Sequence, residues 1–290
     1  MHIPESELIL NEDGSIYHLN LLPHDIAPTI ILVGDPDRVG KVSKNFEEII
    51  VKKRKREFVT HTGYYKKKKI TVISTGIGTD NIDIVLNELD ALTNIDFKTR
   101  EIKGSINTLD IIRIGTSGSL QPHIKVDDFL LSKYAVGFDS LLHFYESDHV
   151  QNIEIQEAIV KQTKWYEKKS DPYVVEASTS LAKIFEDEKV HQGFTATSVG
   201  FYGPQSRKLR LEVQDSELNE RLTAFNHKGL RITNLEMETA GIYGLASLLG
   251  HRAVSLNCIL ANRPNKTFSK NGGASVERLI KFTLDRLASV

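Results

Sequence analysis

Short apolar runs of strand length alternate along the chain with segments in which apolar residues recur at helical spacing. The runs predict buried strands at residues 30–33, 70–74, 109–114, 129–136 and 253–260. Residues 82–92 follow the helical period, and Asp80 or Asn81 is in place to cap the start of that helix. The repeated order of strand, glycine-rich turn and helix indicates a layered α/β fold with loops gathered at strand ends.

The rest of the pattern predicts two more helices and two less regular stretches. Residues 236–249 predict a helix ended by a glycine, and Ser275 is in place to cap a last helix. Residues 95–108 are polar and predict an excursion between a helix and a strand, while residues 139–172 predict loops around a short helix. Because no repeat and no long linker interrupts the chain, we expect a single domain over residues 1–290.

Composition places the chain among ordinary globular proteins. Hydrophobic residues make up 40% and charged residues 26%, and the formal net charge is -1, so no overall field attracts nucleic acid or anionic lipid. The only cysteine, Cys258, excludes a disulfide framework and fits a reducing compartment. With no signal-peptide pattern and no apolar run long enough to cross a bilayer, we expect a cytoplasmic protein.

Three glycine-rich turns are similar to catalytic motifs, but each fails by one position. Residues 34–42 place five residues between two glycines where an ATP-binding P-loop has four. Residues 76–81 lack the third glycine of a dinucleotide-binding turn, and residues 115–119 lack the last glycine of a serine-hydrolase turn. The ten histidines include no pair with zinc-hydrolase spacing, so no metal site is expected from them.

The same turns share the features of an anion site. Each follows a predicted strand, and two carry arginines: Arg38 lies after the first strand, and Arg113 lies inside the third. Glycines let backbone N–H groups approach an anion, and a guanidinium can donate two parallel hydrogen bonds to phosphate oxygens. A charge inside an apolar run needs a partner, so the three turns together predict a bound anion.

A strongly basic stretch surrounds residues 58–65. Residues 52–56 and 66–69 are all lysine or arginine, and the pattern predicts a hairpin that turns at Thr62 and Gly63. Because the total charge is nearly neutral, a solvated hairpin face fits these side chains better than a nucleic-acid patch, which stays open as a second interpretation.

Seven short motifs occur in the order found in the nucleoside phosphorylase family, which includes bacterial uridine phosphorylase. They are GDPDR at 34–38, REF at 56–58, STGIG at 74–78, RIGTSG at 113–118, FYGPQSR at 201–207, NLEME at 234–238 and NR at 262–263. The chain resembles this family from about His18 to the last helix. The resemblance implies a three-layer α/β/α sandwich around a central mixed, distorted sheet, and an enzyme, a pentosyltransferase that converts a nucleoside and phosphate into free base and ribose 1-phosphate.

The resemblance also implies where the substrates bind. It places five residues at the phosphate: Gly34, Arg38, Arg113, Thr116 and, from a neighbouring subunit, Arg56. His18 would cross a dimer interface to the ribose 5′-hydroxyl. Five residues would line the nucleoside: Ser117, Gly118, Glu236, Met237 and Glu238, the last accepting hydrogen bonds from the ribose hydroxyls.

The chemistry of glycosidic cleavage agrees with these assignments. Positive charge develops on the sugar and negative charge on the base, so a carboxylate near the ribose and a cation near the base both stabilise the transition state. Phosphate is itself the nucleophile, and Arg207, Glu238 and Arg113 are expected to carry catalysis. Glu236 and Glu238 are two residues apart and are expected to diverge, which leaves one to face the sugar. In the competing interpretation both are acids at a helix N-terminus.

The base is predicted from residues 201–207. By resemblance Phe201, Gln205 and Arg207 would read uracil, because an amide offers both a donor and an acceptor and a guanidinium donates to O4. The purine branch carries an acid where residues 261–263 are Ala-Asn-Arg, which favours a pyrimidine. We therefore expect phosphorolysis of uridine, and of deoxyuridine as a second substrate, in pyrimidine salvage.

The expected assembly is a homo-oligomer, a hexamer built as a trimer of dimers with shared active sites. No cofactor is expected beyond phosphate as co-substrate, although the resemblance implies a monovalent cation at Glu57, where Asn81 replaces a serine ligand. The alternatives are a purine nucleoside phosphorylase or a nucleosidase of the same family, and a noncatalytic protein that binds nucleosides or nucleic acid through the basic hairpin.

Overall fold

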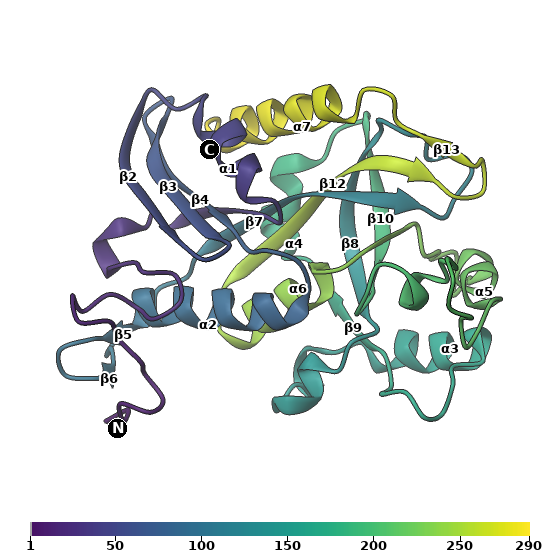
Figure 1. Cartoon of the computed structure of the whole chain (residues 1–290), viewed down its shortest axis with the longest axis horizontal. Coiled ribbons are helices and arrows are strands. Elements are labelled where there is room, and N and C mark those ends of the chain that lie inside the picture. The colour runs from purple at the N-terminus through teal and green to yellow at the C-terminus, as the bar shows by residue number, and fades with distance from the viewer. Residues whose placement is uncertain (1) are drawn as a thin grey trace.

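A computed structural model describes residues 2–290, so Met1 of the predicted domain lies outside the described residues. Most of the chain is organised around one large mixed β-sheet with a small two-stranded sheet beside it (Figure 1). The strands are β1 Thr29–Val33, β2 Glu48–Lys55, β3 Phe58–Tyr65, β4 Lys68–Ser74, β5 Ile95–Asp96, β6 Glu101–Ile102, β7 Asp110–Ser119, β8 Phe129–Gly137, β9 Tyr173–Glu176, β10 Val190–Thr197, β11 Asn234–Glu236, β12 Arg252–Asn262 and β13 Thr267–Phe268.

Seven α-helices and five short 3-10 helices connect these strands in residues 2–290. The α-helices are α1 Pro36–Ser43, α2 Thr79–Asn94, α3 Ile153–Thr163, α4 Thr179–Ala182, α5 Leu218–Ala224, α6 Thr239–Leu248 and α7 Gly272–Leu287. The 3-10 helices are Pro23–Asp25, Leu141–Phe144, Asp148–Val150, Lys183–Phe185 and Gly203–Gln205.

Half of the large sheet closes on itself. Strand β12 pairs with β8, β8 with β10, β10 with β11, β11 with β7, and β7 again with β12. The other half extends from β7 through β1, β4, β3 and β2 as an open, twisted ribbon. Parallel and antiparallel pairs both occur, so the sheet is mixed and strongly distorted.

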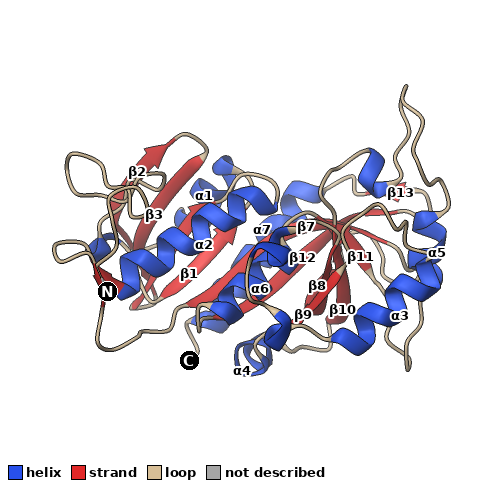
Figure 2. Cartoon of the chain, turned by 90° about the horizontal axis from the view of Figure 1, so that it is seen from below, coloured by secondary structure: helices blue, strands red, loops and turns tan. Residues whose placement is uncertain are grey.

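Helices cover both faces of the open half, and β1 shows why. Its residues are buried on both sides and alternate between two cores: Ile30 packs in the core under α2 and α6, and Ile31 in the core under α1 and α7. Figure 1 shows α7 and α2 on opposite sides of the sheet, and Figure 2 shows α3 and α5 beside the closed half. The prediction of a three-layer α/β/α fold with a central mixed sheet is confirmed.

All five predicted strands are present, but the predicted hairpin turn at Thr62 and Gly63 is wrong. Both residues lie inside β3, which pairs with β2 and β4 along its length. A Cβ at Gly63 would lie 2.1 Å from the carbonyl oxygen of Glu48, so this glycine permits close approach of two strands and does not form a turn. Most of the basic run at residues 52–56 is strand β2, and residues 66–69 form the turn into β4 and its first residues.

Three helix starts also differ from the prediction. Helix α2 begins at Thr79 with Gly78 as N-cap, because Gly78 has a φ of 97° that a side chain rarely adopts. Helix α7 begins at Gly272 after Asn271, and α6 begins only at Thr239. Residues 234–236, assigned in part to that helix by their pattern, form strand β11 instead. The excursion at residues 95–108 and the loops around a short helix at residues 139–172 are as predicted.

Candidate active site

A cavity of about 870 Å³ opens where β1 and β4 end, above the middle of β7 and beside β11. The turns after β1 and β4 touch there, since a Cβ at Gly34 would lie 3.3 Å from the carbonyl oxygen of Gly76. Most residues predicted for the site line this cavity: Gly34, Arg38, Glu57, Arg113, Thr116, Ser117, Gly118, Phe201, Gln205, Arg207, Glu236, Met237 and Glu238. The parallel arrangement of β1, β4 and β7 brings them together from distant parts of the sequence.

One end of the cavity is suited to an anion. Helix α1 begins there, with Asp35 as N-cap accepting a hydrogen bond from the amide of Asp37. Arg38 lies in the first turn of α1 and donates to the carbonyl oxygen of Ile114 at 3.1 Å. Burial and the nearby charge of Arg113 lower the pKa of Arg38. Helix N-terminus, guanidinium and the Thr116 side chain therefore meet at one end of the cavity.

Arg113 occupies the centre of the site and is 5% exposed. Its guanidinium lies 2.6 Å from Oε2 of Glu238 and 3.0 Å from Oε2 of Glu236, and it donates to Oδ1 of Asn257 at 3.0 Å. Burial acts to lower the pKa of Arg113, but the two carboxylates outweigh it and raise that pKa. Arg113 is a charged residue in an apolar strand and requires a partner of opposite charge. The two glutamates are that partner.

The two glutamates converge, and the prediction that they diverge is wrong. Strand β11 runs antiparallel to β7, with Leu235 opposite Gly118, so the chain after it returns toward Arg113. Both carboxylates then meet the same guanidinium nitrogen.

Their remaining contacts separate their roles. Glu236 accepts hydrogen bonds from the hydroxyl of Thr197 and from the amides of Glu238 and Thr239, so it caps the start of α6 as the competing interpretation expected. Besides Arg113, Glu238 accepts from the amide of Gly78 at 3.0 Å. Burial raises the pKa of Glu238, and Arg113 opposes that effect. Glu238 therefore has more free acceptor capacity for substrate hydroxyls.

Glycine is required two residues after Arg113. A Cβ at Gly115 would lie 1.7 Å from Nη1 of Arg113, because the guanidinium folds back over the strand. The glycine at position 115 of the RIGTSG motif therefore leaves room for the Arg113 side chain, in addition to any role it has in ligand binding.

The other end of the cavity offers hydrogen-bonding groups beside an aromatic ring. Gln205 is 2% exposed, and its Oε1 accepts a hydrogen bond from Arg207. The Arg207 guanidinium lies 3.8 Å from the centre of the Phe201 ring, and Arg263 donates to the carbonyl oxygen of Gln205 at 2.7 Å. Burial, together with the charge of Arg263, lowers the pKa of Arg207 to about 10, so the guanidinium remains charged at neutral pH.

Two predicted residues, His18 and Arg56, do not line their own chain's cavity. His18 lies against α2, where its Nδ1 is 2.7 Å from Oε1 of Glu88. Arg56 is exposed in the turn between β2 and β3, next to Glu57 at the cavity rim. Lys55 connects the two segments, because its ammonium donates to the carbonyl oxygen of Tyr17. His18 and Arg56 therefore belong to neighbouring parts of the molecule outside the cavity.

Several lining residues were given no site role from the sequence. Among them, Leu235, Leu260, Ala261 and Phe268 add apolar surface to the cavity. Leu235 lies inside the NLEME motif, and Leu260 and Ala261 directly precede the NR motif, which is a usable signal. Phe268 is reached only through the pairing of β13 with β12, so no local pattern indicates it.

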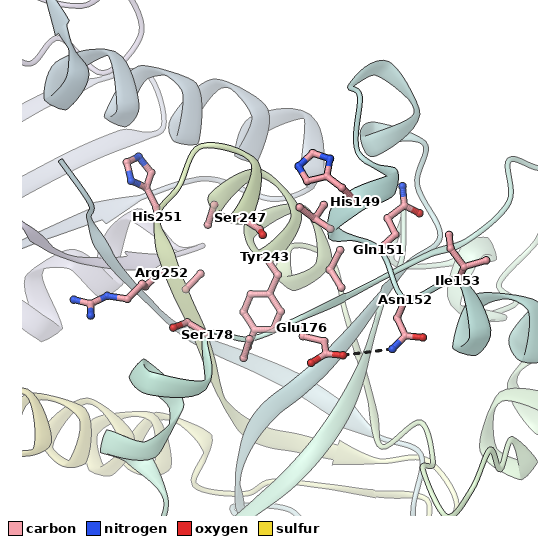
Figure 3. Close-up of a pocket in the computed structure, with 15 residues that line it drawn as sticks. His149, Gln151, Asn152, Ile153, Glu176, Ser178, Tyr243, Ser247, His251 and Arg252 are labelled. Carbon is pink, nitrogen blue, oxygen red and sulfur yellow. Dashed lines mark hydrogen bonds between the residues drawn. The ribbon is translucent and has the colours of Figure 1, made fainter. Parts of the chain in front are cut away.

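A second cavity, of about 550 Å³, lies between α6, β9 and the start of α3 (Figure 3). Among the described residues that line it, none is a predicted site residue. Two of its polar groups are engaged with protein partners: Arg252 lies 2.6 Å from Asp110, and the Asn152 amide contacts Glu176. We assign it no chemistry. Within residues 2–290, no group of three His, Cys, Asp or Glu side chains is arranged to hold a metal ion, and none of the helices has the length and apolar character to cross a membrane.

Comparison with known proteins decides the family. The model of the phosphorylase superfamily matches residues 28–288. The chain belongs to this superfamily. Uridine phosphorylase of Thermococcus kodakarensis is 32% identical over 270 residues, which cover 90% of this chain and 82% of that protein. A DeoD-type purine nucleoside phosphorylase of Buchnera aphidicola is 26% identical over 271 residues, covering 92% and 97%.

Among solved structures, a nucleoside phosphorylase from Trypanosoma brucei that shows uridine phosphorylase activity superposes with a TM-score of 0.88. Its sequence is 30% identical, and the match covers 98% of this chain and 100% of that one. The predictions of the family, the fold and an enzyme of the pentosyltransferase class are confirmed.

Proposed function

We propose that this member of the phosphorylase superfamily catalyses phosphorolysis of uridine to uracil and ribose 1-phosphate. One observation carries the proposal: a single cavity joins an anion site at Arg38, a buried carboxylate at Glu238, and a glutamine–arginine pair at residues 205 and 207. In this order, these groups match the phosphate, the ribose and the uracil of the reaction. The ribose lies between the other two, because phosphate attacks its C1′ atom and uracil leaves from that same atom.

The roles follow from where charge develops. The C1′–N1 bond breaks with its electron pair moving to uracil, while a phosphate oxygen forms the new bond to C1′. Glu238, held by Arg113, stabilises the positive charge on the ribose. Arg207 stabilises the departing uracil anion, which later takes a proton from water. Arg38, Arg113, Gly34 and Thr116 orient the phosphate.

The late strand supports a pyrimidine over a purine. The purine branch carries its acid in the segment that reads Ala-Asn-Arg at residues 261–263 here, and none of these three residues is an acid. Asn262 is 1% exposed and absent from the residues that line the cavity. Its amide donates to the carbonyl oxygens of Gln121 and Ile124 at 2.9 and 2.7 Å, so it anchors a loop. Gln205 instead presents an amide at the base end, where uracil offers both a donor and acceptors.

A homodimer with shared sites is part of the proposal, with a hexamer as its higher assembly. It is supported by His18 and Arg56, two residues that the family resemblance assigns to a partner's site and that lie outside their own cavity. In a neutral His18 ring, Nδ1 donates to Glu88, which leaves Nε2 as acceptor for a ribose hydroxyl. The proposed monovalent cation has Glu57 and Asn81 on the rim, both beside Gly76. The cytoplasm remains the proposed compartment.

Substrate choice tests the proposal. We expect kcat/KM for uridine to exceed that for inosine by at least 100-fold, of order 3 kcal/mol, because inosine leaves the buried Gln205 mispaired. Deoxyuridine and thymidine complete the panel and rank the effects of the 2′-hydroxyl and the 5-methyl group. A preference for inosine would instead support the purine branch.

A further inference from the structure

One buried carboxylate near the site has no part in the proposed chemistry. Asp139 lies just beyond the end of β8 and is 6% exposed. The hydroxyl of Tyr173 donates to both of its oxygens at 2.9 Å, and the amide of Leu141 donates at 2.8 Å. The Thr79 side chain also faces this carboxylate, and its polar interaction helps to lower the pKa that burial raises. An ionisable group so deeply buried and so fully surrounded by donors fixes the groups around it.

The contact with Thr79 connects Asp139 to the active site. Thr79 is the first residue of α2, and the preceding amide, that of Gly78, donates to Oε1 of Glu238 at 3.0 Å. Arg113 holds the other oxygen of Glu238 at 2.6 Å. The orientation of the Glu238 carboxylate is therefore set by two groups, and one of them moves with the first turn of α2.

The first turn of α2 is also closely packed against the helix that follows Glu238. A Cβ at Gly241, in α6, would lie 3.0 Å from Cγ2 of Thr79. Thr79 is thus held on one side by the backbone of α6 and on the other by Asp139.

We propose that Asp139 is a positioning residue for Glu238: by holding Thr79, it directs the Gly78 amide at the carboxylate that faces the ribose. The inference rests on the proposed function, because it assigns Glu238 to the ribose hydroxyls. Burial raises the pKa of the Asp139 carboxyl, and hydrogen bonds oppose that effect. Tyr173, whose own pKa is raised well above its ordinary value by burial, stays protonated as a donor.

Asp139→Asn is the informative variant, because it keeps the shape of the side chain but replaces one acceptor oxygen by a donor. We expect kcat/KM for uridine to fall about 10- to 100-fold, since small displacements of a catalytic group have effects of that size. In a Glu238→Gln background, the same change is expected to have little further effect. With 2′,3′-dideoxyuridine, which lacks the hydroxyls that Glu238 would bind, the loss is expected to be several-fold smaller.

A matched control separates positioning from general damage. Asp25 is also a buried aspartate at 5% exposure, ion-paired with Lys53 at 2.7 Å, but it lies before β1, whereas the cavity lies beyond the other end of that strand. Asp25→Asn is expected to lower thermal stability and leave kcat/KM for uridine unchanged. Amide hydrogen exchange of the peptide that contains Gly78 is expected to quicken in Asp139→Asn and not in Asp25→Asn.

The outcomes are distinguishable. Equal losses with uridine and dideoxyuridine, or an undiminished loss in the Glu238→Gln background, would overturn the inference and make Asp139 a purely structural residue. Unchanged kcat/KM in Asp139→Asn would overturn it as well. If the unmodified enzyme released no uracil from uridine and phosphate, the proposed function would fail, and the exchange measurement would still decide whether Asp139 holds the first turn of α2.

Discussion

Arg113→Ala is the substitution from which the structure predicts the largest combined loss of stability and activity. The guanidinium contacts two buried carboxylates at 2.6 and 3.0 Å, and no solvent reaches them easily, because Glu236 and Glu238 are only 4% and 6% exposed. Truncation leaves two like charges facing each other without a cation.

The magnitude follows from the geometry. At these separations and an effective dielectric constant of about 20, Coulomb attraction is about 6 kcal/mol for each contact, much of which desolvation offsets. Removing one partner of a buried pair typically costs about 3–5 kcal/mol, which is a large share of the roughly 5–15 kcal/mol that stabilise a domain. We therefore expect Arg113→Ala to lower the free energy of unfolding by about 3–5 kcal/mol and to remove nearly all turnover.

Urea unfolding followed by circular dichroism measures the first effect, and uracil release from uridine measures the second. Arg38→Ala is the control, because Arg38 donates to a backbone carbonyl and is not paired with a carboxylate at close range. It is expected to lose turnover with at most about 1.5 kcal/mol of stability. Adding Glu236→Gln to Arg113→Ala is expected to restore part of the stability and none of the turnover. If Arg113→Ala unfolded at the wild-type urea concentration, the buried ion pair would not exist as described.

Three further substitutions test other parts of the account. Arg207→Ala is expected to raise the activation free energy of uridine cleavage, measured from kcat, by about 2–4 kcal/mol, because the guanidinium faces developing charge. An effect on KM alone would make Arg207 a ground-state contact. Equal amounts of Arg56→Ala and Arg207→Ala subunits, allowed to exchange, are expected to recover about a quarter of wild-type activity, because one site in four is then intact in a symmetric dimer; no recovery would mean that each site is built within one chain. Glutamine at residues 66–69 is expected to leave kcat/KM for uridine within about twofold, as for surface positions generally; loss of the main activity would favour a nucleic-acid-binding role.

The fold was predictable where the chain carries a strong period. The strand at residues 30–33 and the helical stretch at residues 82–92 follow from apolar spacing alone, since burial on two faces or on one stripe leaves few alternatives. Single glycines and runs of charged residues were less informative about where strands and turns lie. Gly63 is a glycine because β2 approaches it closely, and sequence cannot separate that reason from a turn. The basic residues at 52–55, interpreted as a solvated hairpin face, lie in strand β2, where side chains alternate between exposed and half-buried.

The sequence predicted which turns form the candidate site, but it did not predict how their side chains are arranged in space. Each glycine-rich turn is visible in the sequence, but the convergence of Glu236 and Glu238 on Arg113 depends on the antiparallel pairing of β11 with β7. That pairing is three residues long at most and leaves no periodic signal. The contribution of Asp139 is hidden for the same reason, because it acts through Thr79, 60 residues away along the chain.

Dependence of uracil release on inorganic phosphate tests the central claim most directly. Uridine is incubated with the enzyme in phosphate-free buffer and in a phosphate titration, and uracil and ribose 1-phosphate are both quantified. The account predicts no uracil without phosphate, a saturable rise with phosphate, and one ribose 1-phosphate for each uracil. Equal uracil release without phosphate, with free ribose as the second product, would show that water is the nucleophile and would contradict it.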